Sequence, residues 1–227
     1  MRKKIYLDYQ ATTPVDAKIL KKMMPFFAEN FGNPHSNNHS IGRLANEAVE
    51  EARENIANLI NAEKSEIIFT SGATESNNLA IKSIAKNYFE NNCQIITVKT
   101  EHKCVLESCY ELEKNGFQVT YLDVSEDGII NLSDLENLLK KRKALVSIMH
   151  ANNETGVIQP IKKIAELCKK YNSIFHSDIA QSIGTQKIDV MEMNIDSCSI
   201  SGHKIYGPKG IGALYVSNNI KNTLQPL

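Results

Sequence analysis

From residue 66 onward, short apolar runs alternate with segments of helical periodicity. Strands that are apolar throughout are typical of sheets buried on both faces, and alternation with helices implies right-handed crossovers. The pattern therefore predicts an α/β fold with a mostly parallel sheet and helices on both faces. The predicted strands are 66–70, 94–99, 117–122, 144–149, 173–177, 195–200 and 211–216, and the predicted helices are 75–91, 103–115, 133–141 and 161–171.

The chain before residue 66 has a different pattern. Residues 5–9 could form a short strand, and Asp16 is a suitable N-cap for a helix that ends near Pro25. Gly and Asn-Pro signals predict a loop over 31–40. Residues 40–61 predict the clearest helix, and its one apolar face is expected to pack against the core. No linker separates two complete domains.

Length, charge and cysteine content narrow the class of protein. The 227 residues suffice for one large domain, and 26 basic residues balance 26 acidic ones. A net charge of zero argues against nucleic acid or an anionic membrane as the main partner. The N-terminus has no signal-peptide core, and no apolar run is long enough to span a bilayer. Five cysteines without a Cys-x-x-Cys pair indicate reduced thiols and a cytoplasmic location.

Metal binding is not expected from this sequence. His35 and His39 lie in the 31–40 loop, but no acidic or cysteine residue stands at a ligand-like spacing from them.

The segment after the first predicted strand suits an anion. Ligands of such sheets bind outside the carboxyl ends of the strands. Residues 71–78 combine small and hydroxyl side chains with a glycine and lead into a helix, so they could cradle a phosphate. No Gly-Lys-Ser/Thr follows, which excludes a Walker loop. The alternative is simple helix capping by Ser71 or Thr74.

Three more strand ends carry polar side chains. His102 could stack on an aromatic ligand or move a proton, or it could be a surface or capping residue. The polar loop 150–156 could orient ligand oxygens. Asp178 ends an apolar strand and needs a partner, since an unpaired buried carboxylate is unfavourable. A protonated pyridine nitrogen would be such a partner.

Lys204 stands in the Gly/Pro-rich turn 201–210, directly after the strand 195–200. A single loop lysine is usually solvated, but a lysine amine can also form a Schiff base with an aldehyde. The strand ends together suit a ligand with an anionic tail, a basic aromatic nitrogen and an aldehyde. That ligand is pyridoxal 5′-phosphate, whose ring acts as an electron sink.

Several ordered motifs resemble one enzyme family, the cysteine desulfurases of the iron–sulfur cluster assembly type, which are class V aminotransferase-like enzymes. The resemblance runs from Ile5 to about Val216. The matching motifs are YLDYQATTP at 6–14, FGNPHS at 31–36, TSGATESN at 70–77, TEHK at 100–103 and SGHK at 201–204.

The resemblance implies roles for individual residues. Lys204 corresponds to the lysine that forms the Schiff base with the cofactor, and His102 to the histidine that stacks on the ring and is implicated in proton transfer. These two are the expected catalytic residues. Asp178 corresponds to the partner of the ring nitrogen, Gln181 to the residue bonded to the ring hydroxyl, and Asn153 to a residue that orients cofactor and substrate. The residues that correspond to phosphate contacts are Ala73, Thr74, Ser201 and His203.

The resemblance also implies an organisation. Residues 16–227 correspond to the pyridoxal phosphate-binding large domain of fold type I, and 1–15 to a segment that helps to build the small domain. In the family, a longer C-terminal part supplies the nucleophilic cysteine loop, the substrate-binding arginine, a residue that reaches the neighbouring subunit's phosphate and most of the small domain. None of the five cysteines stands in a similar Ser/Gly-rich loop, and Cys104 is expected to be a packed thiol.

The implied activity is conversion of L-cysteine to L-alanine, with sulfur passed on as a persulfide for iron–sulfur cluster assembly. A homodimer and a sulfur-acceptor or scaffold protein are the expected partners. Two alternatives stay open: a related class V lyase that needs no nucleophilic cysteine, and a non-catalytic or split-gene half that requires a complementary C-terminal polypeptide.

Overall fold

The structure, a computed structural model, describes residues 4–88 and 94–225. Its centre is a seven-stranded sheet in the order β1-β7-β6-β5-β4-β2-β3. All neighbouring strands are parallel except that β7 runs antiparallel to both β6 and β1, which confirms the predicted mostly parallel sheet. The strands are β1 (Ile67–Thr70), β2 (Gln94–Val98), β3 (Gln118–Leu122), β4 (Ala144–Ser147), β5 (Ile174–Asp178), β6 (Ser197–Ser201) and β7 (Gly212–Val216).

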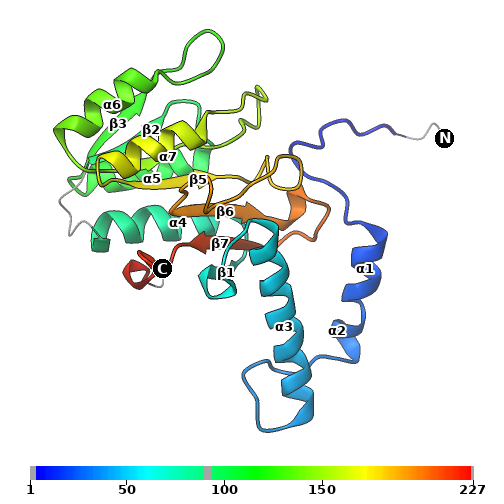
Figure 1. Ribbon diagram of the computed structural model, residues 1–227. Coiled ribbons are helices and arrows are strands. Elements are labelled where there is room, and N and C mark those ends of the chain that lie inside the picture. Colours follow the sequence, from blue (N-terminus) through cyan, green and yellow to red (C-terminus); the bar gives the residue numbers. More distant parts are fainter. Residues whose placement is uncertain (1–3, 89–93, 226–227) are drawn as a thin grey trace.

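Helices cover both faces of the sheet (Figure 1). Side chains alternate along each strand, so that Val146 of β4 joins one hydrophobic cluster and its neighbour Leu145 joins the other. The helices α4 (Ala73–Ser83) and α5 (Lys103–Lys114) cover one face. The other face is covered by α6 (Leu132–Lys141), α7 (Ile161–Lys170) and the end of α3 (Ser40–Leu59).

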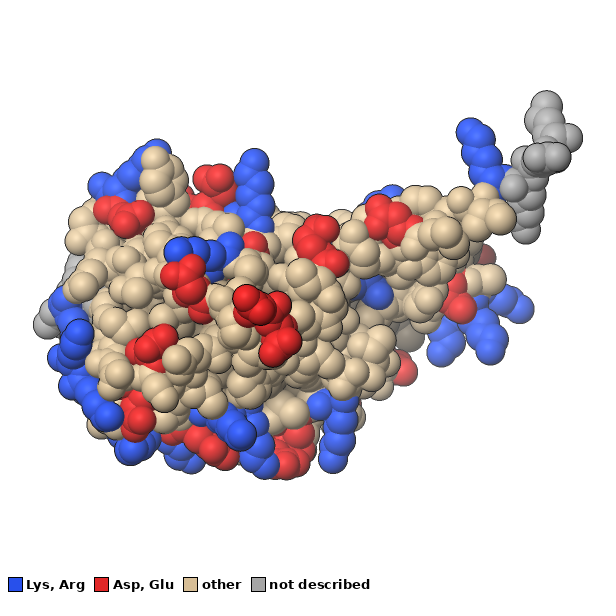
Figure 2. Space-filling model, turned by 90° about the horizontal axis from the view of Figure 1, so that it is seen from above, with Lys and Arg blue, Asp and Glu red and all other residues tan. Residues whose placement is uncertain are grey.

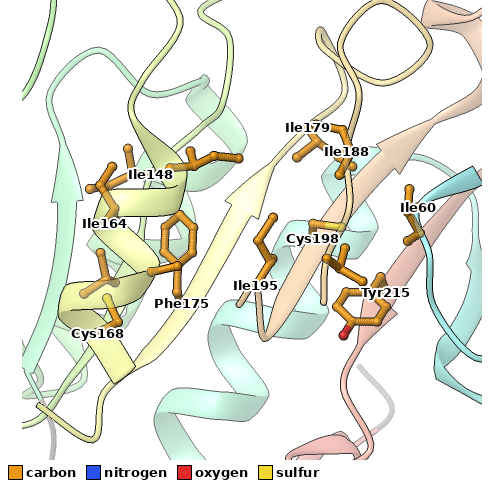
Figure 3. Packing of buried hydrophobic residues seen from close by; sticks show 14 of the residues in the cluster. Ile60, Ile148, Ile164, Cys168, Phe175, Ile179, Ile188, Ile195, Cys198 and Tyr215 are labelled. Carbon is orange, nitrogen blue, oxygen red and sulfur yellow. The ribbon is translucent and has the colours of Figure 1, made fainter. Parts of the chain in front are cut away.

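The larger cluster lies under α7. Phe175 of β5 packs with Ile164 and Cys168 of α7, while Cys198 and Tyr215 extend the cluster across β6 and β7 (Figure 3). All five side chains are essentially inaccessible to solvent. Burial of this extent holds the sheet rigid and fixes the positions at which its strands end.

The six strands β1 to β6 run in the same direction, so their carboxyl ends lie at one edge of the sheet. In the register of the strands, Thr70 at the end of β1 lies opposite Gly212, and Gly212 lies opposite Ser201 at the end of β6. A Cβ atom on Gly212 would lie 2.5 Å from the carbonyl oxygen of Ile200 and 2.6 Å from the Cα of Gly72. Only glycine allows β7 and the turn after β1 to approach this closely.

The segment before β1 extends away from the sheet. In Figure 1, α3 projects away from the sheet. The short helices α1 (Ala17–Met23) and α2 (Pro25–Ala28) precede α3 in the sequence. Neither α1 nor α2 buries a single residue. Most large exposed hydrophobic side chains of the described residues fall between positions 5 and 44, and they include Ile5, Leu7, Phe27, Phe31 and Leu44.

Two predictions for this segment are wrong. Residues 5–9 form no strand, and Ile5 and Leu7 are 83% and 88% exposed, because no described strand lies alongside to pair with them. The apolar face of α3 is also not fully packed, since Ile41 and Leu44 are 51% and 56% exposed. The C-terminal end of the helix reaches the core through Ala57, whereas its N-terminal half projects beyond the sheet.

The remaining elements agree with the predictions. Asp16 caps α1 by accepting a hydrogen bond from the backbone N–H of Lys18 at 2.7 Å, and the predicted boundaries of strands and helices differ by one or two residues from those observed. The helix predicted over 75–91 consists of α4 followed by a π-helical turn, Ile84–Tyr88, and its last three residues lie outside the described part, as does Cys93.

The face of the molecule that is seen from above is not dominated by charge of one sign. Figure 2 shows basic and acidic side chains interspersed, consistent with the balanced composition. Within residues 4–88 and 94–225, no helix has the length and apolarity needed to cross a bilayer, and no group of three or more His, Cys, Asp or Glu side chains could hold a metal ion.

Candidate active site

A pocket of about 610 Å³ opens at the carboxyl edge of the parallel strands. All nine residues singled out from the sequence line it, although they come from five separate segments of the chain. They are Ala73, Thr74, His102, Asn153, Asp178, Gln181, Ser201, His203 and Lys204. A slightly larger hollow, about 690 Å³, lies at the opposite edge beside Ser173 and Ile195 and contains none of them.

Lys204 closes the 3₁₀ turn that follows β6, and its amine faces backbone oxygens of the N-terminal segment. Nζ donates a hydrogen bond to the carbonyl oxygen of Ala11 at 3.0 Å and another to that of Gln10. Burial lowers the pKa of Lys204 from its ordinary value, while the charges of Asp178 and Asp8 oppose this effect. A lowered pKa increases the fraction of neutral amine, which is the form that attacks a carbonyl carbon.

The N-terminal segment is tied to the lysine turn by Thr12 and Thr13. The backbone N–H and the hydroxyl of Thr13 both donate to the carbonyl oxygen of His203, at 3.0 and 2.9 Å. The Thr13 hydroxyl also accepts from the backbone N–H of Tyr206 at 3.0 Å, and the Thr12 hydroxyl lies 3.0 Å from Nδ1 of His203. Gln10 and Ala11 thereby become part of the pocket wall, which no periodicity in the sequence indicates.

The first turn of α4 offers donors for an anion. Its N-cap is Gly72, with no side-chain cap, so the alternative of capping by Ser71 or Thr74 is wrong. Ser71 instead donates its backbone N–H and its hydroxyl to Glu75, at 2.7 and 2.6 Å. Residues 73 and 74 occupy the first turn, where backbone N–H groups have no acceptor within the helix and the helix dipole favours negative charge.

Basic side chains also line the pocket. Lys209 and His203 line it together with Ser201. Burial lowers the pKa of His203, and the neighbouring charges of Lys204 and Lys209 lower it further. A phosphate-sized anion would meet backbone N–H groups, the hydroxyl of Ser201, the imidazole of His203 and the cationic amine of Lys209.

Asp178 lies at the end of β5 and is only 7% exposed. One carboxylate oxygen accepts from the backbone N–H of Ala180 at 2.9 Å, and the other accepts from the side-chain amide of Asn77 at 2.7 Å. Burial raises the pKa of Asp178, while these two hydrogen bonds and the nearby His102 and Lys204 lower it. A cation placed in the pocket would further favour the ionised carboxylate.

His102 caps α5, as one interpretation of the sequence predicts, and it also lines the pocket, where stacking on a ligand or proton transfer stays a prediction. Its Nδ1 accepts from the backbone N–H of Cys104 at 3.2 Å and lies 3.0 Å from the Cys104 thiol.

The preceding Glu101 is buried and accepts from the backbone N–H of Met149 at 2.5 Å. Burial raises the pKa of Glu101 well above its ordinary value, which favours the neutral carboxyl at this position.

The two amides predicted to orient a ligand lie at the rim. Asn153 donates to the Glu154 carboxylate at 2.7 Å, and Gln181 donates to the carbonyl oxygen of Gln10 at 2.9 Å. Gln10 therefore accepts from both Gln181 and Lys204.

Two buried polar residues behind the pocket, Asn77 and His176, escaped the sequence interpretation, and Cys104, which lines the pocket, was expected only to be a packed thiol. Asn77, Cys104 and His176 are at most 9% exposed and connect to Asp178 or His102 through hydrogen bonds. One signal was available, because Asn77 stands three residues after Thr74 and so lies on the same helix face. His176 gave no such signal, since it stands in the middle of an apolar strand.

Comparisons with known proteins agree with this arrangement. Residues 5–227 match the model of the family described as aminotransferase class-V. The chain is 58% identical over 223 residues to cysteine desulfurase IscS of Rickettsia bellii (strain OSU 85-389), covering 98% of this chain and 54% of that protein. The chain thus spans about half the length of the curated relatives that it matches.

Solved structures share the fold. The structure of SspA in complex with cysteine has a TM-score of 0.94 and 46% sequence identity, with 99% of this chain and 64% of that chain covered. The apo structure of cysteine desulfurase from Thermococcus onnurineus NA1 has a TM-score of 0.90 and 30% identity, with 98% and 56% covered. The sheet is that of fold type I pyridoxal phosphate-dependent enzymes. The chain belongs to the aminotransferase class-V family and, within it, to the cysteine desulfurase group.

Proposed function

We propose that this chain is the cofactor-binding large domain of a pyridoxal phosphate-dependent cysteine desulfurase. The substrate would be L-cysteine, the product L-alanine, and the sulfur would leave as a persulfide for iron–sulfur cluster assembly. The observation that carries the proposal is the convergence of Lys204, Asp178, His102 and the first turn of α4 on one pocket. The likeness to a structure described as SspA in complex with cysteine supports the choice of substrate.

The donor set of the pocket fits the cofactor at both ends. The first turn of α4 with Ala73 and Thr74, and Ser201 and His203 on the other side, would hold the phosphate. Asp178, buried and with a raised pKa, gains from a cationic ring nitrogen as its partner. When bound, the cofactor supplies an electron sink that stabilises negative charge on the substrate carbon.

Side chains of this chain would bind the cofactor, move protons and orient the substrate. The Lys204 amine, with its lowered pKa, would bind the cofactor and then be available to carry a proton. His102 would stack on the ring and hold or move a second proton. Asn153 and Gln181 would orient cofactor and substrate once their amides exchange the present contacts with Glu154 and Gln10.

The thiol that accepts sulfur is not among the described cysteines. Cys104, Cys109, Cys168 and Cys198 are free and buried, and burial raises the pKa of each. A buried thiol with a raised pKa is a poor nucleophile. We therefore place the accepting thiol outside the part of the chain that the structure describes. By the family resemblance, the substrate-binding arginine would come from the longer C-terminal part of those enzymes. The buried, reduced cysteines also fit the predicted cytoplasmic location.

We also propose a domain division and partners for this chain. Residues 16–227 would form the large domain, and 1–15 would contribute to a small domain. The exposed apolar side chains of α1, α2 and the first half of α3 form a surface that a monomer rarely leaves open, and a second copy of the chain would cover it. A sulfur-acceptor or scaffold protein, or a complementary C-terminal polypeptide, would dock in addition.

The proposal is tested by incubating the chain with pyridoxal phosphate, L-cysteine and a reductant, and measuring alanine and sulfide. Because L-cysteine is itself a small thiol, a low activity is expected from the chain alone, with a marked increase when a C-terminal polypeptide with its own cysteine or a further small thiol is added. The Lys204→Ala variant is the control. Equal alanine release by wild type and Lys204→Ala would refute the assignment.

The absence of a reactive thiol from the described residues also favours a second candidate, a related class V lyase. Such an enzyme would release the β-substituent of cysteine sulfinate or a selenium analogue without any nucleophilic cysteine. Comparing these substrates with L-cysteine, with and without added thiol, separates the two candidates. Thiol-independent turnover that prefers the analogues would favour the lyase.

A further inference from the structure

Asn77 connects the two sides of the pocket from behind. It is fully buried on α4, and its side chain contacts three others. Nδ2 lies 2.7 Å from a carboxylate oxygen of Asp178 and 3.2 Å from the thiol of Cys104, and Oδ1 lies 2.9 Å from Nε2 of His176. A buried amide with contacts on all its polar atoms is fixed in one orientation.

The direction of each hydrogen bond follows from chemistry. An ionised carboxylate only accepts, so the amide nitrogen of Asn77 must face Asp178, and its second N–H is left for Cys104. Oδ1 then faces His176, whose Nε2 must carry the ring proton. Nδ1 of His176 is left to accept from the Ser197 hydroxyl at 3.1 Å. Burial lowers the pKa of His176 to about 3, so its ring is neutral and both roles are possible.

The hydrogen-bond directions around His102 follow in the same way. The backbone N–H of Cys104 donates to Nδ1 of His102 at 3.2 Å, so Nδ1 is an acceptor in the neutral ring. The thiol, which lies 3.0 Å from the same atom, can therefore interact favourably only by donating its proton. Burial and the nearby Asp178 raise the pKa of Cys104 to about 11, which keeps the thiol protonated at neutral pH. The proton of the neutral His102 ring then resides on Nε2.

We propose that Asn77 and Cys104 are positioning residues of this site, forming one hydrogen-bonded chain that couples the carboxylate of Asp178 to the imidazole of His102. The inference rests on the proposed function only in naming Asp178 and His102 as cofactor partners. This hydrogen-bonded chain holds both side chains at a fixed separation and, together with the backbone N–H of Cys104, keeps the proton of the neutral His102 ring on Nε2. Cys104 acts through His102 and is not the sulfur acceptor.

The first test reads the ring nitrogens of His102 directly. In the ¹⁵N-labelled chain without cofactor, at a pH where the ring is neutral, Cys104→Ala should move the Nδ1 resonance by several parts per million toward that of a less hydrogen-bonded acceptor. Cys104→Ser should restore it, because a hydroxyl can both donate and accept. Cys109→Ala is the matched control, since Cys109 is buried on the same helix and has no hydrogen bond to His102 in the structure. An unchanged resonance in Cys104→Ala, or an equal change in Cys109→Ala, overturns the proposal.

The second test measures the coupling. Asp178→Asn should shift the Nδ1 resonance of His102 when Cys104 is present, and its effect should fall to a small remainder in the Cys104→Ala background. Equal effects of Asp178→Asn in both backgrounds would show that Asp178 acts on His102 through space. The proposed hydrogen-bonded connection through Asn77 and Cys104 would then be refuted. Both tests use the chain without cofactor, so they can fail or succeed independently of whether Lys204 binds pyridoxal phosphate.

Discussion

The amine of Lys204 donates a 3.0 Å hydrogen bond to the backbone carbonyl of Ala11, 193 positions earlier in the chain. The candidate lysine therefore lies between the turn after β6 and the N-terminal segment. Because a covalent bond at Nζ leaves the nitrogen with fewer hydrogens to donate, cofactor binding must weaken its contacts with the carbonyls of Gln10 and Ala11. The position of the N-terminal segment then depends on its other anchors.

Thr13 is the main such anchor, and Thr13→Val should loosen it. The substitution keeps the shape of the side chain but removes the hydroxyl that bridges the carbonyl of His203 and the N–H of Tyr206. The N–H of Tyr206 then loses its partner, while the carbonyl of His203 keeps only the backbone N–H of Thr13, so the free energy of unfolding should fall by roughly 1–3 kcal/mol. Hydrogen exchange of the Tyr206 amide should become faster. Thr120→Val on the edge strand β3 is the control, and equal effects of the two substitutions would count against the anchor.

Gly212→Ala should disturb the anion-binding turn. The added Cβ would lie 2.6 Å from the Cα of Gly72 and 2.5 Å from the carbonyl of Ile200, so β7 and the turn must separate. We expect at least a tenfold weaker affinity for pyridoxal phosphate, measured by fluorescence titration. Gly116→Ala, at a positive φ of 90° with nothing near its Cβ, should cost about 1 kcal/mol of stability without changing affinity. Equal affinities for wild type and Gly212→Ala would contradict the close-approach argument.

Asp196 should make stability depend on pH. Its half-buried carboxyl accepts from the backbone N–H of Phe175 at 2.8 Å, and burial raises its pKa from 3.8 to about 6. Between these values the unfolded chain loses this proton while the folded chain keeps it, so this contribution to stability falls as pH rises and is constant above about 6. Its total size is roughly 3 kcal/mol.

The check is urea unfolding of wild type and Asp196→Asn between about pH 4 and about pH 7. Wild type should lose stability relative to the variant over the lower part of this range, and the two should run parallel above it. Parallel profiles throughout would mean that the carboxyl titrates normally in the folded chain.

Self-association should depend on the exposed face of α3. Leu44 is 56% exposed on this face, and covering its apolar surface would stabilise a complex. Leu44→Ser should shift the monomer–dimer equilibrium toward monomer in sedimentation velocity. The matched control is Glu47→Ser, which replaces an exposed polar residue on the same helix. A monomer in both variants and in wild type would argue that another molecule covers this face.

The sequence predicts the sheet well because its five inner strands are buried on both faces and most of them lie in apolar runs of the sequence. Asp178 and Lys204 could be located for the same reason, since a polar residue directly after such a run must lie at the carboxyl edge. The N-terminal segment is different, because the apolar face of α3 is real but nothing described covers half of it. Residues such as Thr13 and His176 act through contacts with distant parts of the chain, and their local sequence gives no sign of them.

The central claim is that Lys204 is the residue that binds the cofactor. The most direct measurement is incubation with pyridoxal phosphate, reduction with borohydride and peptide mass spectrometry. We predict that the added mass is found on the peptide carrying Lys204, with little on Lys209 in the same turn, and that labelling is lost in Lys204→Ala. Labelling spread evenly over surface lysines, or unchanged in Lys204→Ala, would contradict the account.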